Sequence, residues 1–253
     1  MVTRTTAEKL YEACGFRPKP WLVHRMLRLP SHELVGFVAI PGPVPQRLLG
    51  HDDIAFERKM FRARRAVRLI SFLPFVRAVA VCNSLGFQMV HEESDIDLFV
   101  VAAEGRVWST RWWVTGVLAL LRMRPGESVR DPICVSFFID ETVIDLSTLR
   151  IENDVYFEYW LRSLMPVLGT HKLFELGAKT APEFRVKNHI SRAREFFAGL
   201  LSERFVRRQQ MNIMPTDVKD RAALGDTTVV LSDTTIKLHQ NDRRAELRDI
   251  VFK

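Results

Sequence analysis

The chain has 253 residues, of which 47% are hydrophobic and 26% are charged. This composition excludes a largely disordered chain and leaves room for one large domain or two small ones. The net charge of +7 favours anionic partners such as nucleotides, RNA or anionic lipid. The three cysteines are far apart in the sequence, and we interpret them as reduced residues of a cytoplasmic protein.

We expect neither a secretory signal nor a membrane span. Residues 1–9 are polar, and no apolar signal-peptide core follows them. The longest apolar run, residues 112–121, is about half as long as a membrane span and lies between Arg111 and Arg122. We interpret this run as a buried helix and expect a cytoplasmic location without a membrane partner.

Residues 1–52 are expected to form an N-terminal extension. Short helices are predicted within residues 3–29, broken at Pro18 and Pro20, and a strand is predicted at residues 34–40 within a proline-rich loop. The residue types of this segment do not indicate any chemistry.

A long helix is predicted from Asp53 to the residues before Pro74. Apolar residues recur at spacings of three and four, which indicates one face packed on a core. Basic residues fill most of the remaining positions, and these are Arg58, Lys59, Arg62, Arg64, Arg65 and Arg68. A solvated basic face is the commoner explanation, and a surface that steers a triphosphate or a polyanionic acceptor is the alternative.

Two aspartates indicate a metal site at the start of a strand. Asp95 and Asp97 are followed by an apolar run, and residues two apart on a strand point to the same face. Convergent carboxylates repel each other unless a cation neutralises them. Hard oxygen ligands suit Mg²⁺ or Mn²⁺, so the pair predicts one of these ions.

A tight turn precedes this strand in the sequence. The apolar strand predicted at residues 76–82 leads into Asn83, Ser84, Leu85 and Gly86. Small residues in such a turn let backbone N–H groups approach a polyphosphate. One element of the chain therefore offers a phosphate-binding turn and a metal-binding pair.

This stretch resembles the signature of the nucleotidyltransferase superfamily that includes DNA polymerase β, kanamycin nucleotidyltransferase and small bacterial stand-alone enzymes. The signature is a Gly-Ser pair after a strand, followed by Asp-x-Asp between apolar residues. Asn83-Ser84 stands at the Gly-Ser pair, and Asp95-Ile96-Asp97 stands at the Asp-x-Asp. Asn83 replaces the usual glycine, and asparagine tolerates a positive φ better than most residues.

The resemblance implies transfer of a nucleoside monophosphate from an NTP, for which we expect ATP, with pyrophosphate as the leaving group. It implies that Asp95 and Asp97 hold Mg²⁺ or Mn²⁺, and that Asn83, Ser84 and Gly86 bind the nucleotide. The acceptor stays open between a small molecule, a protein side chain and an RNA end.

The family also implies a third carboxylate, on a strand that corresponds to residues 133–139 here. Ser136 stands where that carboxylate is expected. Asp140 lies four residues further on, on the same strand face by parity. We therefore treat Asp140 as the candidate that helps the metal and accepts the proton of the acceptor.

The expected fold is α/β, with a small mixed β-sheet and flanking helices over residues 53–150. Residues 151–253 are expected to form a mainly helical C-terminal domain with one short hairpin, at residues 227–231 and 235–238. A polar cluster begins in the second hairpin strand and continues after it, and it comprises Lys237, His239, Asp242, Arg243 and Arg244. It is either a surface cluster, which is the commoner case, or a site where His239 orients an acceptor or a phosphate.

Two other functional classes stay open. Asn83 and Ser136 depart from the family pattern, which is compatible with a non-catalytic nucleotide-binding or regulatory module of the same fold. The net charge is compatible with an RNA-binding module, although no regular alternation of aromatic and basic residues stands out. The sequence contains no P-loop, dinucleotide-binding, hydrolase-elbow or zinc-spacing motif.

Overall fold

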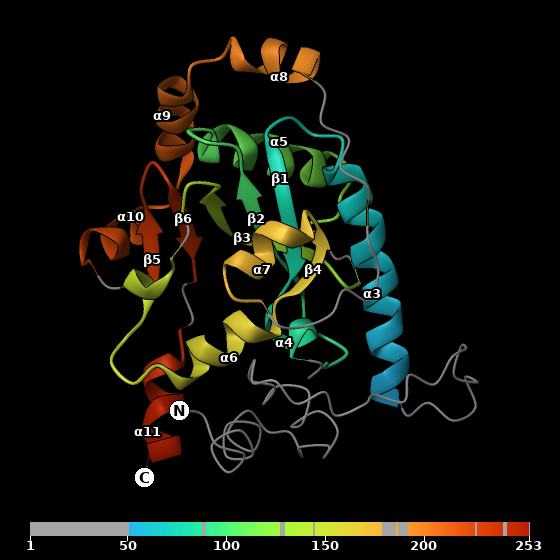
Figure 1. The fold of residues 1–253 in the computed structure, drawn as a ribbon, viewed down its shortest axis with the longest axis vertical. Helices are drawn as coiled ribbons and strands as arrows, with labels where there is room; N and C mark the ends of the chain where they lie inside the picture. Colours follow the sequence, from blue (N-terminus) through green and yellow to red (C-terminus); the bar gives the residue numbers. More distant parts are fainter. Residues whose placement is uncertain are drawn as a thin grey trace.

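The structure is a computed structural model that describes residues 51–87, 90–126, 130–143, 145–178, 186, 192–225, 227–239 and 242–252. These residues form a mixed α/β fold around one six-stranded sheet (Figure 1). The α/β class predicted from the sequence is confirmed. The helices and the strand predicted within residues 1–50 lie outside the described residues.

The strands are β1 (Val76–Val81), β2 (Ile96–Ala102), β3 (Ile133–Asp140), β4 (Met165–Leu168), β5 (Val229–Leu231) and β6 (Thr235–Leu238). The helices are α3 (His51–Ile70), α4 (Asn83–Gly86), α5 (Val107–Leu120), α6 (Val155–Ser163), α7 (Thr170–Glu175), α8 (Arg192–Gly199), α9 (Glu203–Ile213), α10 (Thr216–Ala223) and α11 (Arg244–Phe252), with a short 3₁₀ turn at Ser147–Leu149. The long helix, the three apolar strands and the hairpin were all predicted near these positions.

The strand order is β4-β1-β2-β3-β6-β5. Among the described strands only β2 and β3 pair in parallel, and α5 provides the crossover between them that a parallel pair requires. Strands β4, β5 and β6 come from residues 151–253, where we expected a separate, mainly helical domain. The sheet therefore contains strands from both sides of the domain boundary expected near residue 150. Its two edge strands, β4 and β5, both come from the C-terminal part of the chain.

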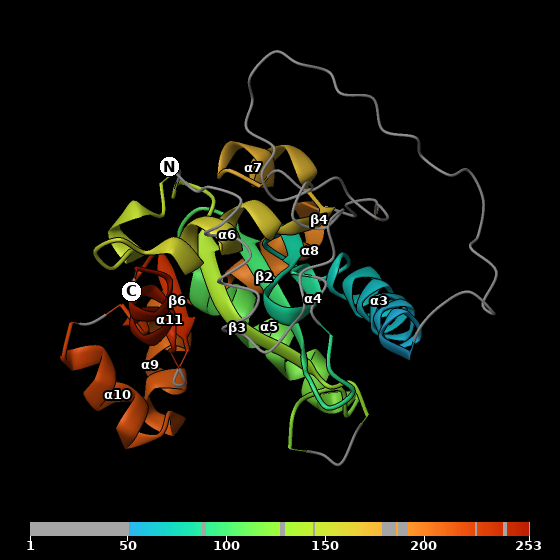
Figure 2. The same ribbon diagram turned by 90° about the horizontal axis from the view of Figure 1, so that it is seen from below.

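Helices cover both faces of the sheet (Figures 1 and 2). Helices α3 and α5 pack against the face that carries Leu98 and Val100, and α6, α7 and α11 pack against the face that carries Phe99 and Val101. Successive residues of β2 thus point into two different cores, as the period of a strand requires. A central strand buried on both faces explains the continuous apolar run of β2.

The sequence did not predict two local features of the C-terminal part. The strand β4 was missed because Pro166 lies inside it, but β4 is at the sheet edge, where a missing N–H is tolerated. Two separate helices, α8 and α9, lie on either side of residues 200–202.

Helix α5 is only partly buried, although we predicted residues 112–121 as a buried helix. Trp108 is fully buried and donates from its indole nitrogen to the Ser232 carbonyl at 3.0 Å, whereas Trp112 is 43% exposed. None of the helices in the described ranges is both long and apolar enough to cross a membrane.

A buried cation lies at the centre of the contacts made by α3. We predicted Lys59 on the basic outer face of this helix, but its side chain is fully buried. Its ammonium donates to Asp131 Oδ1 at 2.7 Å and to the carbonyls of Glu92 and Ser94 at 3.1 and 2.5 Å. Three acceptors match the three N–H donors of a lysine, which compensates for the desolvation of its charge.

Asp131 is the anionic partner of this lysine and is also buried. Burial alone would raise the pKa of Asp131, but hydrogen bonds and charges from Arg58 and Lys59 lower it to about 2. Asp131 immediately precedes Pro132, whose carbonyl accepts from the N–H of Ile96 at 2.8 Å. The ion pair therefore ties α3 to the entrances of both β2 and β3.

We predict that Lys59→Met lowers the free energy of unfolding by about 3 kcal/mol, because it removes one of the two cationic partners of the buried Asp131 and leaves two carbonyls without their donor. Urea unfolding at pH 7 measures this change. The matched control is Arg68→Met, an exposed residue of the same helix, which should change the free energy by less than about 0.5 kcal/mol. Equal effects of the two substitutions would contradict the assignment.

Candidate active site

The turn after β1 has the backbone conformation that the sequence suggested. Cys82 is extended, and Asn83 then has a φ of 52°, in the left-handed region that asparagine tolerates. The chain continues into the short helix α4, where Ser84 is partly exposed. Asparagine thus adopts this conformation without the strain that a β-branched residue would introduce.

Gly86 has a packing role in the structure. It is buried, and a Cβ atom built on it would lie 3.2 Å from the Ser163 carbonyl and 3.3 Å from the Val81 carbonyl. Its N–H already donates to the Cys82 carbonyl at 3.2 Å. Gly86 therefore allows α4 to approach α6 closely. Three turn residues were predicted to bind nucleotide, and of these only Asn83 and Ser84 have partly exposed side chains.

The side chain of Asn83 joins two elements of the site. Its Oδ1 accepts a hydrogen bond from the indole nitrogen of Trp160 on α6 at 2.9 Å. The same side chain also hydrogen-bonds the carboxyl group of Asp97. Because an amide offers both an acceptor and donors, Asn83 can connect Trp160 to Asp97 in a way that glycine could not.

Asp97 is the second residue of β2, and Asp95 immediately precedes the strand. Burial raises the pKa of Asp97 to about 6, the Asn83 hydrogen bond opposes this shift, and the negative charge of Asp95 adds to it. Burial also raises the pKa of Asp95, against the positive charge of Lys59. Two acidic groups whose ionised forms are both disfavoured form a site that a cation would stabilise.

Cys134 is a further partner of Asp97 that sequence reasoning missed. It pairs with Asp97 in the parallel β2–β3 register, and its thiol hydrogen-bonds the Asp97 carboxyl. Burial and the charge of Asp97 raise the pKa of Cys134 to about 12, so the thiol stays protonated at neutral pH and can donate. No sequence motif indicated this contact, which depends on the register of the two strands.

Ser136 lies beside this group, on an irregular part of β3. The register advances from Asp97–Cys134 to Phe99–Phe137, which is two residues on β2 and three on β3. Such a bulge interrupts the alternation of faces. Ser136 hydrogen-bonds Cys134 and lines the same pocket as Asn83.

The structure does not bring Asp140 to the carboxylate pair. Asp140 pairs with Ala102 at the far end of the parallel strands, whereas Asp97 pairs with Cys134 at their beginning. It is 1% exposed, and its two oxygens accept from the backbone N–H groups of Gly105 and of Thr142, the latter at 2.7 Å. Asp140 therefore fixes the turns after β2 and β3, and the parity argument failed because it ignored position along the strand.

A pocket of about 190 Å³ lies next to Asn83 and Ser136. Aromatic residues of α6 and β3 form one wall, where the rings of Trp160 and Phe137 stack with centroids 5.3 Å apart. Residues from the end of β6 and the start of α11 form the opposite wall. The lining residues are Cys82, Asn83, Ser136, Phe137, Tyr156, Phe157, Trp160, Lys237, His239, Asp242, Arg243, Arg244 and Leu247.

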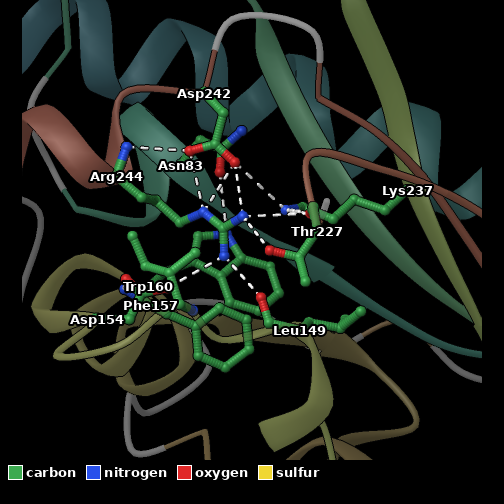
Figure 3. Close-up of polar contacts among 10 residues, drawn as sticks. Asn83, Leu149, Asp154, Phe157, Trp160, Thr227, Lys237, Asp242 and Arg244 are labelled. Carbon is green, nitrogen blue, oxygen red and sulfur yellow. Dashed lines mark hydrogen bonds and ion pairs between the residues drawn. The ribbon is translucent and has the colours of Figure 1, made fainter. Parts of the chain in front are cut away.

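The polar cluster predicted near the C-terminus is part of this pocket. Arg244 is 5% exposed, and its guanidinium donates to Asp242, to Asp154 and to the Leu149 carbonyl (Figure 3). It also donates to the hydroxyl of Thr227 at 2.7 Å. Arg244 therefore holds α11 against the N-terminus of α6 and the hairpin, which places this wall of the pocket.

Lys237 and His239 are the basic residues of the pocket whose pKa values are lowered. Burial lowers the pKa of Lys237 to about 8, and the positive charge of Arg244 adds to the effect. Burial and the charge of Lys237 lower the pKa of His239, so its imidazole is neutral at pH 7. A neutral imidazole keeps one nitrogen able to accept a proton.

The donor set at Asp95 and Asp97 suits Mg²⁺ or Mn²⁺ bound together with phosphate. Within the described ranges, no three His, Cys, Asp or Glu side chains form a group that could hold a metal by themselves. Mg²⁺ usually binds through one or two carboxylates together with substrate phosphates and water. The pair therefore fits a metal that arrives with a nucleotide.

No protein-family model matches the chain, and neither the curated proteins nor the solved structures provide a match.

Trp160 is the other site residue that sequence reasoning missed. It lies on α6, in the part of the chain expected to be mainly helical, and it donates a hydrogen bond to Asn83. The available signal was Asn83 itself, because a half-buried amide needs hydrogen-bond partners.

We predict that Asp97→Asn stabilises the metal-free protein at neutral pH. The folded-state pKa of Asp97 is raised from 3.8 to about 6, so wild-type stability is lost as pH rises through this interval. The variant lacks this loss, and its stability relative to wild type should grow by about 2–3 kcal/mol between pH 4 and pH 7. Urea unfolding in EDTA across this range measures the difference.

Glu93→Gln is the matched control, since it removes an exposed carboxylate from the same loop. A stability difference between Asp97→Asn and wild type that does not change with pH would contradict the assigned environment of Asp97.

Proposed function

We propose that the protein is a metal-dependent nucleotidyltransferase that moves a nucleoside monophosphate from an NTP to an acceptor hydroxyl. The observation that carries the proposal is the juxtaposition of Asp95 and Asp97 with the turn at Asn83 and Ser84. The hydrogen bond between Asn83 and Asp97 connects the two parts directly. The raised pKa values of both carboxyl groups support a site that holds a cation.

Asp95 and Asp97 would hold Mg²⁺, which when bound neutralises charge on the phosphates of the NTP. Asn83 and Cys134 orient the Asp97 carboxylate by hydrogen bonds. Ser84 is partly exposed in the turn and can donate its hydroxyl to a phosphate oxygen. Oriented donors of this kind stabilise charge in phosphoryl transfer without having to rearrange.

The pocket beside Asn83 would receive the acceptor or the nucleoside. Its aromatic wall at Phe137 and Trp160 suits a flat or apolar group, and its polar wall suits hydroxyl groups. Ser136 cannot accept the proton of the acceptor at neutral pH, and Asp140 lies at the other end of the strands. His239, neutral and in the same pocket, is the lining residue best suited to that role.

The experiment that tests this proposal measures Mg²⁺-dependent binding of ATP and the other NTPs by calorimetry, together with pyrophosphate release. Asp95→Asn should weaken Mg²⁺-dependent binding by roughly a hundredfold, because even indirect partners of a metal are worth about ten- to a hundredfold in affinity. Glu93→Gln, from the same loop, should bind like wild type.

A pair of variants at Asn83 tests the turn in the same assay. Asn83→Gly keeps the positive φ and should retain NTP binding, whereas Asn83→Val should abolish it. Binding without pyrophosphate release would favour the non-catalytic nucleotide-binding module. If wild type binds none of the NTPs, the proposed function is wrong.

A further inference from the structure

A second hollow, which we call the α3 groove, lies away from the pocket described above and shares no lining residue with it. One wall is α3, and the other comprises Leu121, Met123, Arg130 and Asp131, which lie between α5 and β3 in the sequence. Its volume is about 520 Å³. The lining residues are Arg58, Phe61, Arg62, Arg65, Leu69, Leu121, Met123, Arg130 and Asp131.

The arginines of the groove follow one face of α3. Arg58, Arg62 and Arg65 are separated by four and three residues, so they lie one above another along the helix. At 1.5 Å per residue, the row spans about 10 Å. A row of this length can contact successive charges of an extended polyanion.

Two of these arginines have no acceptor among the described residues. Arg62 Nε is buried without a hydrogen-bond partner. The side chain of Arg65 is exposed and forms no hydrogen bond or ion pair with another described residue. Arg58 is different, because it bonds Asp131 at 2.7 Å and Glu92 at 3.0 Å. A buried guanidinium N–H without an acceptor is costly, so the groove is suited to an anion that supplies one.

The charge of the groove is predominantly positive. Four arginines line it against the single carboxylate of Asp131. Glu92 offsets part of the charge through ion pairs with Arg58 and Arg130. The excess that remains belongs to Arg62 and Arg65, the same two residues that lack acceptors.

The groove is also lined by exposed apolar side chains. Phe61 is 64% exposed, Leu69 42% and Leu121 47%. A free phosphate would use only the arginines and would leave this apolar surface in water. Single-stranded nucleic acid uses both features, since phosphates pair with arginines while bases stack on aromatic and apolar side chains.

We propose that the α3 groove binds single-stranded nucleic acid, with Arg62 and Arg65 on the phosphates and Phe61 against a base. This inference does not rest on the proposed nucleotidyl transfer, because it concerns binding only. The loop that Arg58 and Lys59 hold leads directly into Asp95, so a bound strand would lie near the carboxylate pair.

The test is fluorescence anisotropy of the full chain with labelled oligouridine and with the DNA oligonucleotide of the same length, at several salt concentrations. Arg62→Ala/Arg65→Ala should weaken binding about tenfold or more and reduce the salt slope by about 2, one unit for each phosphate that an arginine no longer neutralises. Phe61→Ala should weaken binding without changing the slope. RNA and DNA binding with similar affinity supports stacking and phosphate contacts, and a preference for RNA adds a 2′-hydroxyl contact.

The matched control is Arg204→Ala/Arg208→Ala, which removes two exposed arginines four residues apart on α9. Equal losses in the two double variants would overturn the proposal, since only net charge would then matter. Unaltered affinity in Phe61→Ala together with equal competition by inorganic polyphosphate would also overturn it.

If the arginine double variant is unstable, Arg62→Gln replaces it, because glutamine keeps much of the side-chain packing. Arg62→Gln should lose part of the affinity for oligouridine. Full affinity in this variant would contradict a phosphate contact. Oligouridine binding by a wild-type protein that binds none of the NTPs would support this inference and contradict the proposed nucleotidyl transfer, which separates the two tests.

Discussion

The geometry of the candidate active site depends on the ion pair and the hydrogen bonds that the buried ammonium of Lys59 forms. This ammonium joins α3 to the carbonyls of Glu92 and Ser94 and to the carboxylate of Asp131. These groups lie immediately before β2 and β3, the parallel pair that carries Asp97 and Cys134. A desolvated cation with all three donors used allows few alternative arrangements, so the loop that leads into the site is held by a strong, directional contact.

The site itself is assembled by contacts between distant parts of the chain. Asn83 receives a hydrogen bond from Trp160, and Asp97 interacts with Asn83 and Cys134. The C-terminal hairpin pairs with β3, and Arg244 fixes α11 against α6, so the second wall of the pocket comes from the last part of the described chain. The candidate site therefore depends on the edges of the sheet as well as on the strand-turn-strand unit at its centre.

The sequence predicted the features that depend on local pattern, and it failed where long-range pairing decides. The strands on either side of Asn83 follow from apolar runs, and the positive φ of Asn83 follows from its residue type. The burial of Lys59 could not be read from a basic helix, because its partners are far away in sequence. Asp140 was misplaced because parity specifies a face of a strand but not which end of the sheet a residue occupies.

In the function proposed above, Asp95 and Asp97 form a metal site that works with the Asn83–Ser84 turn. The most direct measurement is a crystal structure with Mn²⁺ and a non-hydrolysable ATP analogue, with the metal located by anomalous scattering. We predict a peak about 2.1 Å from oxygens of both carboxylates, the distance typical of a small divalent cation, with the triphosphate beside Ser84. A peak elsewhere, or a triphosphate bound away from this turn while both carboxylates stay without metal, would contradict the account.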